Sequence, residues 1–513
     1  MRQVNGALLG ALLISAPAAA LTPQQANVIV IIADDMGVDK LGSYAADADP
    51  DYAAEASYLP DTPVLDEMAA AGVRFTDAWA NPSCSPTRGA LYSGQYAIRT
   101  GVGMPTGRPD ATFLDPELDT LAEIMEDAGY ATGLFGKWHV GENDPPEGWT
   151  EEELWYDHAG ETLEHELNPI THGWRRFVGT VDGTLYWYQP YSSAYTGDGG
   201  YTDWIALDSE CVDCVTPEVT VHHREDYATD ATVDDTLTWI DEQTEPWLAV
   251  VALHAPHSPW NVPPEGCSYR AEGEAEPTEF IGIYEEMVEC MDRRIGDLLD
   301  GLHDLGDLDD TLVIFAGDNG TEDGLSEGSF DDDNGKSSVY ETGLRVPLII
   351  ADGKDLDRRR DDWRFNPDWR FSPVFVTGWS RAVSAPVHVM DLFATVAEVG
   401  GADASGGVDS VSLMPLLRLG GGDTRELVYS EAFEPDGTGV AAIRSGGWKL
   451  HTTVQEFPTG LCRVGYELYN LGVDRFEQTD LSGVEFVFLA GLQAELNSLV
   501  ASEPGSWLDV PDC

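Results

Sequence analysis

The densest group of chemically capable residues is the run Cys84-Ser85-Pro86-Thr87-Arg88, which precedes Gly89 and a mostly apolar stretch. Pro86 suits the first turn of a helix, because its φ is fixed and its missing N–H is not needed there. A helix start offers free N–H groups and a positive dipole end, and Arg88 adds a planar fork of donors that matches tetrahedral oxyanions. The run therefore predicts an anion site with a thiol beside it. A buried cysteine next to a turn proline is the alternative.

Two acidic motifs supply hard oxygen ligands. Asp34 and Asp35 follow one apolar run, and Asp318 and Asn319 follow another. Either motif alone is typical of a solvated loop or a turn. Three carboxylates brought together without a cation would repel one another and raise one another's pKa values. As a pair, the motifs predict a metal site of the kind that Ca²⁺ or Mg²⁺ occupies.

A set of cationic side chains also falls within short motifs. Its members are Arg88, Lys137, His139, His257 and Lys336. The chain has lysine only at positions 40, 137, 336, 354 and 449, so a motif lysine is a weak candidate for an ordinary surface residue. His254 is the rival of His257 within the same segment. Histidine titrates near neutrality, which suits a proton donor.

The elements that must position these residues are four short apolar runs at 27–33, 130–135, 247–253 and 311–316. Helical patterns alternate with them, which predicts an α/β fold with a large, mainly parallel mixed sheet flanked by helices. Each run is followed by candidate site residues, and ligands bind beyond the carboxyl ends of parallel strands. We therefore expect one common site. An apolar stripe over 280–302 predicts a helix that covers the sheet.

From about residue 427 the pattern changes to four short strands, which predict a smaller C-terminal antiparallel-sheet subdomain. The strands are expected at 427–432, 440–445, 449–453 and 466–471. We place the catalytic domain at 21–425 and the subdomain at 426–513. Residues 351–385, rich in Arg and Trp, are predicted to be a solvated surface insertion, with a substrate-recognition loop as the alternative.

Composition narrows the classes of partner. The 513 residues carry a formal net charge of −63, and 42% of them are hydrophobic, enough for a packed core. So acidic a chain is not expected to bind nucleic acid or an anionic membrane. Residues 1–20 read as a signal peptide, with Arg2, an apolar stretch and an Ala18-Ala19-Ala20 cleavage site. We expect a secreted or periplasmic protein without a membrane anchor.

Seven cysteines leave six when Cys84 is set aside, and outside the cytosol six cysteines are expected to form three disulfides. Proximity in sequence favours the pairs Cys211–Cys214, Cys267–Cys290 and Cys462–Cys513. A zinc site is the competing interpretation of one pair, and its ligands would be Cys211, Cys214, His222 and His223.

The motif Cys84-x-Pro86-x-Arg88, followed by "SGQYAIRTG", resembles the signature of the type I, formylglycine-dependent sulfatases, the arylsulfatase family of the alkaline phosphatase superfamily. The other motifs recur in that family's order: the two aspartates, "GKWHVG", the His-x-Pro segment, "GDNG" and the lysine-serine segment. The likeness is greatest to the arylsulfatase B-like branch. One departure is Glu341-Thr342-Gly343, where the family often has Glu-Gly-Gly.

The resemblance implies an alkaline phosphatase-like fold and a sulfuric ester hydrolase. Its substrate would be an aryl sulfate, another sulfated small molecule or a sulfated carbohydrate. A maturation enzyme would oxidise Cys84 to the formylglycine nucleophile. The implied calcium ligands are Asp34, Asp35, the modified Cys84, Asp318 and Asn319.

The resemblance also implies roles for the cationic residues. Arg88 and His139 would assist the nucleophile, Lys137 and Lys336 would hold the sulfate, and His257 would protonate the leaving group. Three alternatives remain open: a phosphonate or phosphate monoester hydrolase of the same superfamily, a zinc phosphatase, and a non-catalytic extracellular calcium-binding protein.

Overall fold

The computed structural model describes most of the chain. The described residues are 26–44, 59–106, 111–141, 169–181, 183, 185, 200–202, 204–211, 218–244, 246–271, 275–326, 334–357, 381–419, 425–456, 462–503 and 507–508. Several predictions concern residues outside these ranges: the signal peptide at 1–20, Cys214, Cys513 and residues 358–380 of the predicted insertion.

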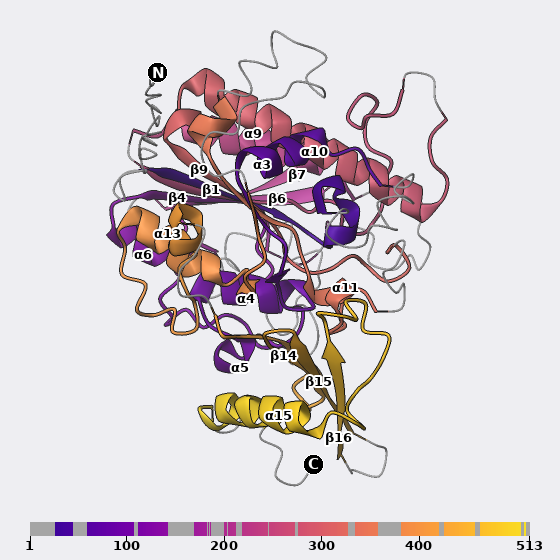
Figure 1. Cartoon of the computed structure of the whole chain (residues 1–513). Helices are drawn as coiled ribbons and strands as arrows, with labels where there is room; N and C mark the ends of the chain where they lie inside the picture. Colours follow the sequence, from indigo (N-terminus) through magenta and orange to yellow (C-terminus); the bar gives the residue numbers. More distant parts are fainter. Residues whose placement is uncertain are drawn as a thin grey trace, which may run out of the picture.

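A ten-stranded mixed sheet forms the centre of the molecule (Figure 1). Its middle strands run parallel to one another, and antiparallel strands complete both sides. In spatial order the strands are β11 (Arg381–Val383), β2 (Val73–Phe75), β10 (Leu348–Asp352), β9 (Thr311–Gly317), β1 (Asn27–Ala33), β8 (Trp247–Ala252), β4 (Ala131–Lys137), β5 (Arg176–Thr180), β6 (Trp204–Glu210) and β7 (Glu218–Arg224). The four predicted strands are β1, β4, β8 and β9, and they are confirmed as neighbours in the order β9-β1-β8-β4.

The central strands are apolar throughout because helices cover both faces of the sheet. In β1, Ile29 and Ile31 point into one hydrophobic layer, whereas Val28, Val30 and Ile32 point into the other. All five side chains are buried. Because side chains alternate along a strand, a continuous β-branched run fills two cores at once.

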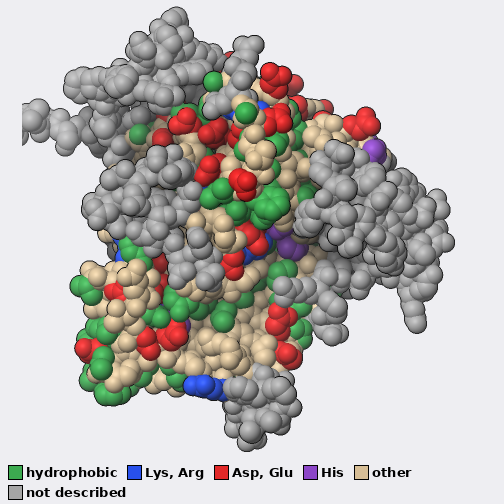
Figure 2. All heavy atoms as spheres, turned by 90° about the vertical axis from the view of Figure 1, so that its right-hand side faces the viewer, with side chains coloured by type: hydrophobic (Ala, Val, Ile, Leu, Met, Phe, Trp, Pro, Cys, Tyr) green, Lys and Arg blue, Asp and Glu red, His purple; other side chains and the backbone are tan. Residues whose placement is uncertain are grey.

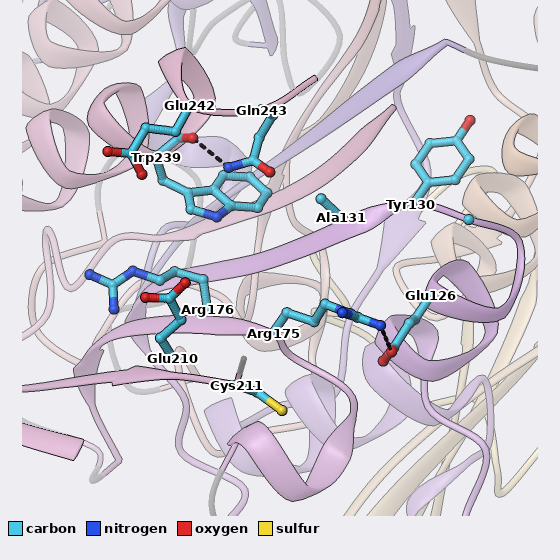
Figure 3. Close-up of a pocket in the computed structure, with 11 residues that line it drawn as sticks. Glu126, Tyr130, Ala131, Arg175, Arg176, Glu210, Cys211, Trp239, Glu242 and Gln243 are labelled. Carbon is cyan, nitrogen blue, oxygen red and sulfur yellow. Dashed lines mark hydrogen bonds and ion pairs between the residues drawn. The ribbon is translucent and has the colours of Figure 1, made fainter. Parts of the chain in front are cut away.

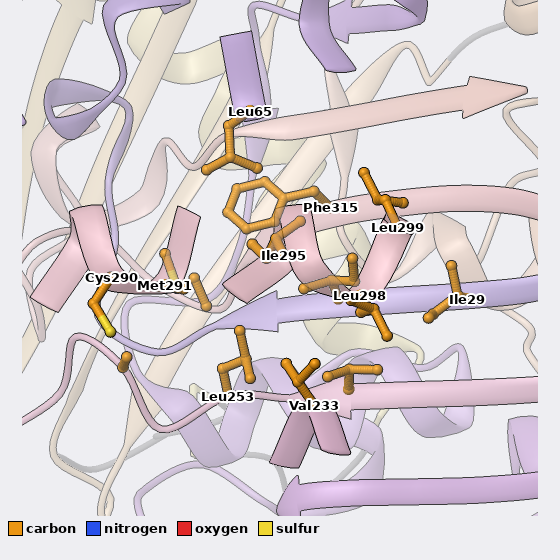
Figure 4. Packing of buried hydrophobic residues seen from close by; sticks show 14 of the residues in the cluster. Ile29, Leu65, Val233, Leu253, Cys290, Met291, Ile295, Leu298, Leu299 and Phe315 are labelled. Atoms are coloured by element: carbon orange, nitrogen blue, oxygen red, sulfur yellow. The ribbon is translucent and has the colours of Figure 1, made fainter. Parts of the chain in front are cut away.

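Helices α3, α9 and α10 pack on one face of the sheet, and α4, α6 and α13 pack on the other (Figure 1). Their bounds are α3 (Pro63–Ala71), α4 (Cys84–Ser93), α6 (Leu121–Asp127), α9 (Ala228–Asp241), α10 (Phe280–Leu305) and α13 (Asp391–Gly400). The predicted helix over 280–302 is α10, and its Ile295, Leu298 and Leu299 meet Ile29 and Phe315 of the sheet (Figure 4).

Short elements connect these layers. They are the 3-10 turns η1 (Val38–Lys40), η2 (Pro169–His172) and η3 (Leu308–Asp310), the helices α5 (Ala97–Thr100), α11 (Glu341–Leu344) and α14 (Met414–Leu419), and the strand pair β3 (Ala78–Trp79) and β12 (Val387–His388).

The predicted C-terminal subdomain is confirmed as a four-stranded antiparallel sheet. It contains β13 (Leu427–Phe433), β14 (Gly439–Ser445), β15 (Trp448–Glu456) and β16 (Cys462–Asn470), and helix α15 (Phe486–Ala501) packs on it. In Figure 1, α4 and α11 lie between this sheet and the central one. The fold class is therefore as expected, and the boundary at 425/426 stays a prediction.

The predicted surface insertion at 351–385 is wrong at both ends. Residues 351–352 belong to β10, and Arg381–Val383 form β11, which pairs with β2 at the edge of the central sheet. The polar composition conceals β11 because an edge strand has no partner on one side and needs no apolar run.

The predicted disulfide Cys267–Cys290 is present, with a Cα–Cα distance of 4.7 Å. The other two predicted pairs each include a residue outside the described ranges. In Figure 2 acidic side chains are spread over the described surface, and basic ones emerge in only a few places, as the net charge requires. Among the described helices, none combines the length and the apolarity needed to cross a membrane.

Candidate active site

One edge of the central sheet gathers the predicted site residues. Strands β9, β1, β8 and β4 are parallel, so their carboxyl ends meet there. Ala33 pairs with Gly317 at the end of the β1–β9 ladder, which places Asp34 next to Asp318. The strand order therefore creates the common site that the sequence predicted.

The acidic residues form the floor of the site. Asp35 donates its backbone N–H to Asp318 Oδ1 (3.1 Å) and accepts a bond from Asn319 Nδ2 at Oδ1 (2.8 Å). Asp35 has a positive φ of 66°, a conformation that few residues except glycine adopt freely. Tyr284 of α10 supports this turn, because its hydroxyl donates to the Asp35 carbonyl oxygen (2.7 Å).

Two oxygens in this floor have no hydrogen-bond partner, although both are buried. They are Asp34 Oδ1 and Asn319 Oδ1. A buried oxygen without a partner is costly, and carboxylate and amide oxygens are ligands that Ca²⁺ and Mg²⁺ accept. The donor atoms of Asp34, Asp35, Cys84 and His257 also all lie within 4.8 Å of one another. The described residues thus fit a divalent cation.

The charges in the floor oppose one another. Burial, followed by the negative charge of Asp34, raises the pKa of Asp318 to about 7. Burial would also raise the pKa of Asp35, but Lys336, His257 and Lys137 together hold it below its usual value. A cation bound here would favour the ionised form of every carboxylate.

Cys84 is the first residue of α4, as the proline pattern predicted. Ser83 before it is extended, and Pro86 occupies the first turn. The Cys84 thiol is buried, and its Sγ lies 4.0 Å from Asp35 Oδ1. Burial raises the pKa of this thiol, with Lys137 and Lys336 opposing only in part. As a cysteine, the residue is therefore a poor thiolate nucleophile.

Arg88 and Lys137 lie fully buried beside the acidic floor. Arg88 donates from Nε to Asp318 Oδ2 (3.0 Å) and from Nη1 to the Lys137 carbonyl oxygen (2.7 Å). Lys137 donates from Nζ to Asp34 Oδ2 (2.5 Å). Buried charges of this kind persist only when they are paired, so each cation here is matched to a carboxylate.

Lys336 approaches from a different segment and lies 2.7 Å from Asp35 Oδ1. Its Nζ also lies 3.5 Å from Glu322 Oε2. The side chains of Lys336, His257 and Glu322 are 14%, 12% and 37% exposed, so they mark the mouth of the site. Sequence reasoning missed Glu322, and the available signal was its place three residues after Asn319.

The histidines differ in their access to the site. His257 Nδ1 donates to the Ser258 carbonyl oxygen (2.5 Å), which leaves Nε2 facing Asp35 Oδ2 at 3.6 Å. Burial lowers the pKa of His257 to about 3, with Asp35 opposing. His254 is deeper and bonds to Thr180 Oγ1 (2.7 Å). The geometry therefore favours His257 over its rival.

His139 follows β4 in a left-handed backbone conformation, with φ 58°. Its Nε2 donates to the Thr106 carbonyl oxygen (3.3 Å), and its buried Nδ1 has no hydrogen-bond partner. Burial, followed by the charges of Lys137 and Arg88, lowers the pKa of His139. All ten predicted site residues therefore lie in or beside one cluster.

Among the described residues, the only other metal-capable group is Asp230 with Cys267 and Cys290, whose sulfurs form the disulfide. The zinc alternative gains no support in the described part, since neither group includes His222 or His223.

A cavity of about 550 Å³ lies away from this cluster, where β4 begins (Figure 3). Its lining includes Arg175, Arg176, Trp239 and Glu242. Arg175 is already paired with Glu126, and Arg176 with Asp208. Both arginines of this cavity are therefore matched to nearby carboxylates, unlike the two oxygens without a hydrogen-bond partner in the acidic floor.

Comparison with known proteins gives a consistent result. The profile described as Sulfatase matches residues 26–402. Arylsulfatase A of Homo sapiens is 27% identical over 465 residues, which cover 86% of this chain and 78% of the relative. N-acetylgalactosamine-6-sulfatase of Homo sapiens is 27% identical over 432 residues, covering 79% of this chain and 68% of the relative.

Solved structures show the same fold. The crystal structure of Ps i-CgsB superposes with a TM-score of 0.66 at 22% identity, covering 94% of this chain and 95% of that one. The structure of BT4656 in complex with D-glucosamine-2-N,6-O-disulfate gives a TM-score of 0.62 at 18% identity, covering 95% and 99%.

Proposed function

We propose that this chain cleaves a sulfated carbohydrate or an aryl sulfate at a formylglycine made from Cys84. The premise is that the chain belongs to the sulfatase family and is a sulfuric ester hydrolase. The resemblance inferred from the motifs is confirmed at the level of the family. The arylsulfatase B-like branch stays a prediction.

The observation that carries the proposal is the position of Cys84. It begins α4, it faces Asp35, and the cations Arg88, Lys137 and Lys336 lie around the same floor. Formylglycine at this position would supply a hydrated aldehyde, and its hydroxyl would be the nucleophile that the thiol cannot provide. The raised pKa of the unmodified thiol argues against cysteine itself as the nucleophile, because the thiol would be mostly protonated and weakly nucleophilic.

A divalent cation fits among Asp34, Asp35, Asp318 and Asn319, two of which carry the oxygens without partners. We propose Ca²⁺, with Mg²⁺ as the alternative, and its positive charge would stabilise the negative oxygens of the reacting group. Asp34 and Asp35 are paired to Lys137 and Lys336. If a cation takes over these carboxylates, both ammonium groups are released to bind sulfate.

The remaining residues have roles that follow from their contacts. Arg88 holds Asp318 in place through a hydrogen bond from Nε to Oδ2 and an ion-pair contact of Nη2 with the same oxygen, and its charge opposes the upward shift of the Asp318 pKa. Lys137 and Lys336 would hold sulfate oxygens by charge-assisted hydrogen bonds. His257 lies at the mouth with Nε2 directed inward, where it can protonate the departing oxygen, and a bound anion raises its pKa from the low value set by burial.

The substrate class is argued by analogy. One similar structure holds k-i-k-neocarrahexaose, another holds D-glucosamine-2-N,6-O-disulfate, and a similar curated protein is an N-acetylgalactosamine-6-sulfatase. These likenesses favour a sulfated carbohydrate over a small aryl sulfate as the natural substrate. We also propose export through residues 1–20 and oxidation of Cys84 by a formylglycine-generating enzyme.

The test combines the mass of the Cys84 peptide with a comparison of two hydrolytic activities. The protein is produced with a formylglycine-generating enzyme, and the Cys84 peptide is expected to be lighter by the difference between –CH₂–SH and –CHO. Turnover of 4-nitrophenyl sulfate is then compared with turnover of 4-nitrophenyl phosphate. Faster phosphate hydrolysis would move the proposal to the phosphate or phosphonate ester alternative. An unmodified cysteine in a fully active sample would refute the formylglycine step.

A further inference from the structure

The segment that carries Lys336 is held against the C-terminal sheet by a buried cluster of charges. We define the Lys449 cluster as Glu341, Lys449, His451 and Glu477. All four side chains are buried. Lys449 and His451 lie on β15 of the C-terminal sheet, and Glu341 begins α11 five residues after Lys336. The cluster therefore joins α11 to the C-terminal sheet.

The contacts within the Lys449 cluster are short and mutually satisfied. Lys449 Nζ lies 3.0 Å from Glu341 Oε1 and 2.9 Å from Glu477 Oε1. His451 Nε2 lies 2.8 Å from the same Glu477 oxygen. Glu477 Oε2 accepts the backbone N–H of Glu341 (2.6 Å), and Trp79 Nε1 donates to Glu341 Oε1 (3.1 Å). Lys449 is thus the shared cation of two buried carboxylates.

The placement of lysine in this chain supports a specific role for Lys449. Only five lysines occur among 513 residues, and Lys40, Lys137 and Lys449 are fully buried. Lys336 lines the mouth of the site, and Lys354 is 42% exposed. Lysine is thus rare in this chain, and one of the few lysines, Lys449, is buried where it neutralises Glu341 and Glu477.

The same segment is fixed to the acidic floor at its other end. Lys336 donates its backbone N–H to the Thr321 carbonyl oxygen (2.9 Å), and Gly320 donates to Gly343 (2.9 Å). Ser337 has a positive φ of 72° and donates to the Pro82 carbonyl oxygen (2.6 Å). A left-handed serine is strained unless its surroundings fix it, so the segment depends on both of its attachments.

We propose that Lys449 is a positioning residue for the active site, which holds the Lys336 ammonium group in place through Glu341. This rests on the proposed function, since it assumes that Lys336 binds the sulfate group. The C-terminal sheet then contributes to sulfate binding without touching the substrate.

The experiment is a double-mutant cycle between Lys449→Met and Lys336→Met in the formylglycine-bearing enzyme. It measures the KM for 4-nitrophenyl sulfate and the affinity for inorganic sulfate by calorimetry. Lys449→Met alone is expected to raise the KM about tenfold and to weaken sulfate affinity about tenfold, with a smaller change in kcat. In the Lys336→Met background, Lys449→Met should change the KM and the sulfate affinity less than twofold, because the ammonium group that Lys449 positions is absent.

Two further variants separate positioning from stability. Glu477→Gln removes one charge of the cluster with little change in shape, and it should also weaken sulfate binding. It serves as the test if Lys449→Met fails to fold. Leu450→Ala truncates the buried neighbour on β15, so it should lower the melting temperature and leave sulfate affinity unchanged.

Equal losses in both Lys336 backgrounds, or an equal loss in Leu450→Ala, would overturn the positioning role. A wild-type enzyme that hydrolyses no sulfate ester would instead refute the proposed function. In that case, calorimetric titration with inorganic sulfate would still measure the coupling between Lys449 and Lys336.

Discussion

The molecule contains two buried ionic clusters, and they differ in how completely their oxygens are satisfied. In the acidic floor, Asp34 Oδ1 and Asn319 Oδ1 have no hydrogen-bond partner, and Asp34 Oδ1 has only a 4.0 Å contact with Arg88 Nη2. In the Lys449 cluster, neither glutamate has a buried oxygen without a partner. Both clusters pair lysine with carboxylates at similar burial. Complete satisfaction marks a structural cluster, whereas the unmet oxygens mark the place where a ligand is required.

The cavity in Figure 3 offers a third region to compare with the two ionic clusters. It has a volume of about 550 Å³, yet its arginines are paired with nearby acids. Volume alone therefore does not identify the reactive region. The concentration of buried, incompletely paired charge identifies it.

The largest expected effect comes from removing the nucleophile of the acidic floor. Cys84→Ala should lower kcat/KM for 4-nitrophenyl sulfate by at least about 10⁴-fold, because no covalent route remains. Its melting temperature should stay near that of the wild type, since only a small group at the start of α4 is lost. The matched control is the wild-type chain produced without a maturation enzyme, which should be equally inactive. Activity in that control would contradict the prediction.

A second prediction concerns the unmet oxygens. Asp34→Asn should lower turnover by at least about 10²-fold and reduce bound Ca²⁺, because a charged ligand is lost. Calcium should raise the melting temperature of the wild type and not that of the variant. Asp230→Asn, in the group whose sulfurs form the disulfide, is the control and should keep its calcium. Metal content is measured by elemental analysis, and a full complement in Asp34→Asn would count against the site.

The Lys449 cluster should respond to acid and not to metal. Burial would raise the pKa of Glu341, but the positive charges of Lys449, Arg444 and Arg345, with Lys449 the largest of the three, together lower it from 4.5 to about 2. The unfolded chain therefore binds more protons between these values, and the stabilisation present above pH 4.5 is lost as the pH falls toward 2. The wild type should exceed Lys449→Met by about 3 kcal/mol in unfolding free energy at pH 7, a gap that narrows below pH 4.5.

Denaturant unfolding at several pH values measures this gap, with and without calcium. A gap that widens on acidification would reverse the sign and refute the assignment of Glu341 as the ionised partner. A gap that depends on calcium would remove the distinction between the two clusters.

The smallest expected effect is at the mouth of the site. Burial, followed by Asp35, raises the pKa of Glu322 to about 7, and Glu322 lies close to Lys336. Glu322→Gln removes a negative charge next to a sulfate-binding ammonium group, so the KM should fall about two- to fivefold at pH 8. Glu242→Gln, beside the cavity of Figure 3, changes the same charge remotely and should have no effect. An equal fall in both variants would indicate only the net charge of the protein.

Much of this architecture could be predicted from local patterns. Strands β1, β4, β8 and β9 are continuous apolar runs because both faces of the sheet are covered, and polar residues necessarily follow where the chain leaves the core. The start of α4 at Cys84 could be predicted for the same kind of reason, since Pro86 has only one favourable place in a helix.

Tertiary structure decided the rest, because it depends on pairings between distant segments. The sequence does not encode locally that β1 lies between β8 and β9, or that Lys336 reaches Asp35 across 301 residues. Strand β11 was concealed because an edge strand needs no apolar alternation. The residue types thus determined which chemistry this chain can perform, and the long-range packing decided which charges are left unsatisfied to perform it.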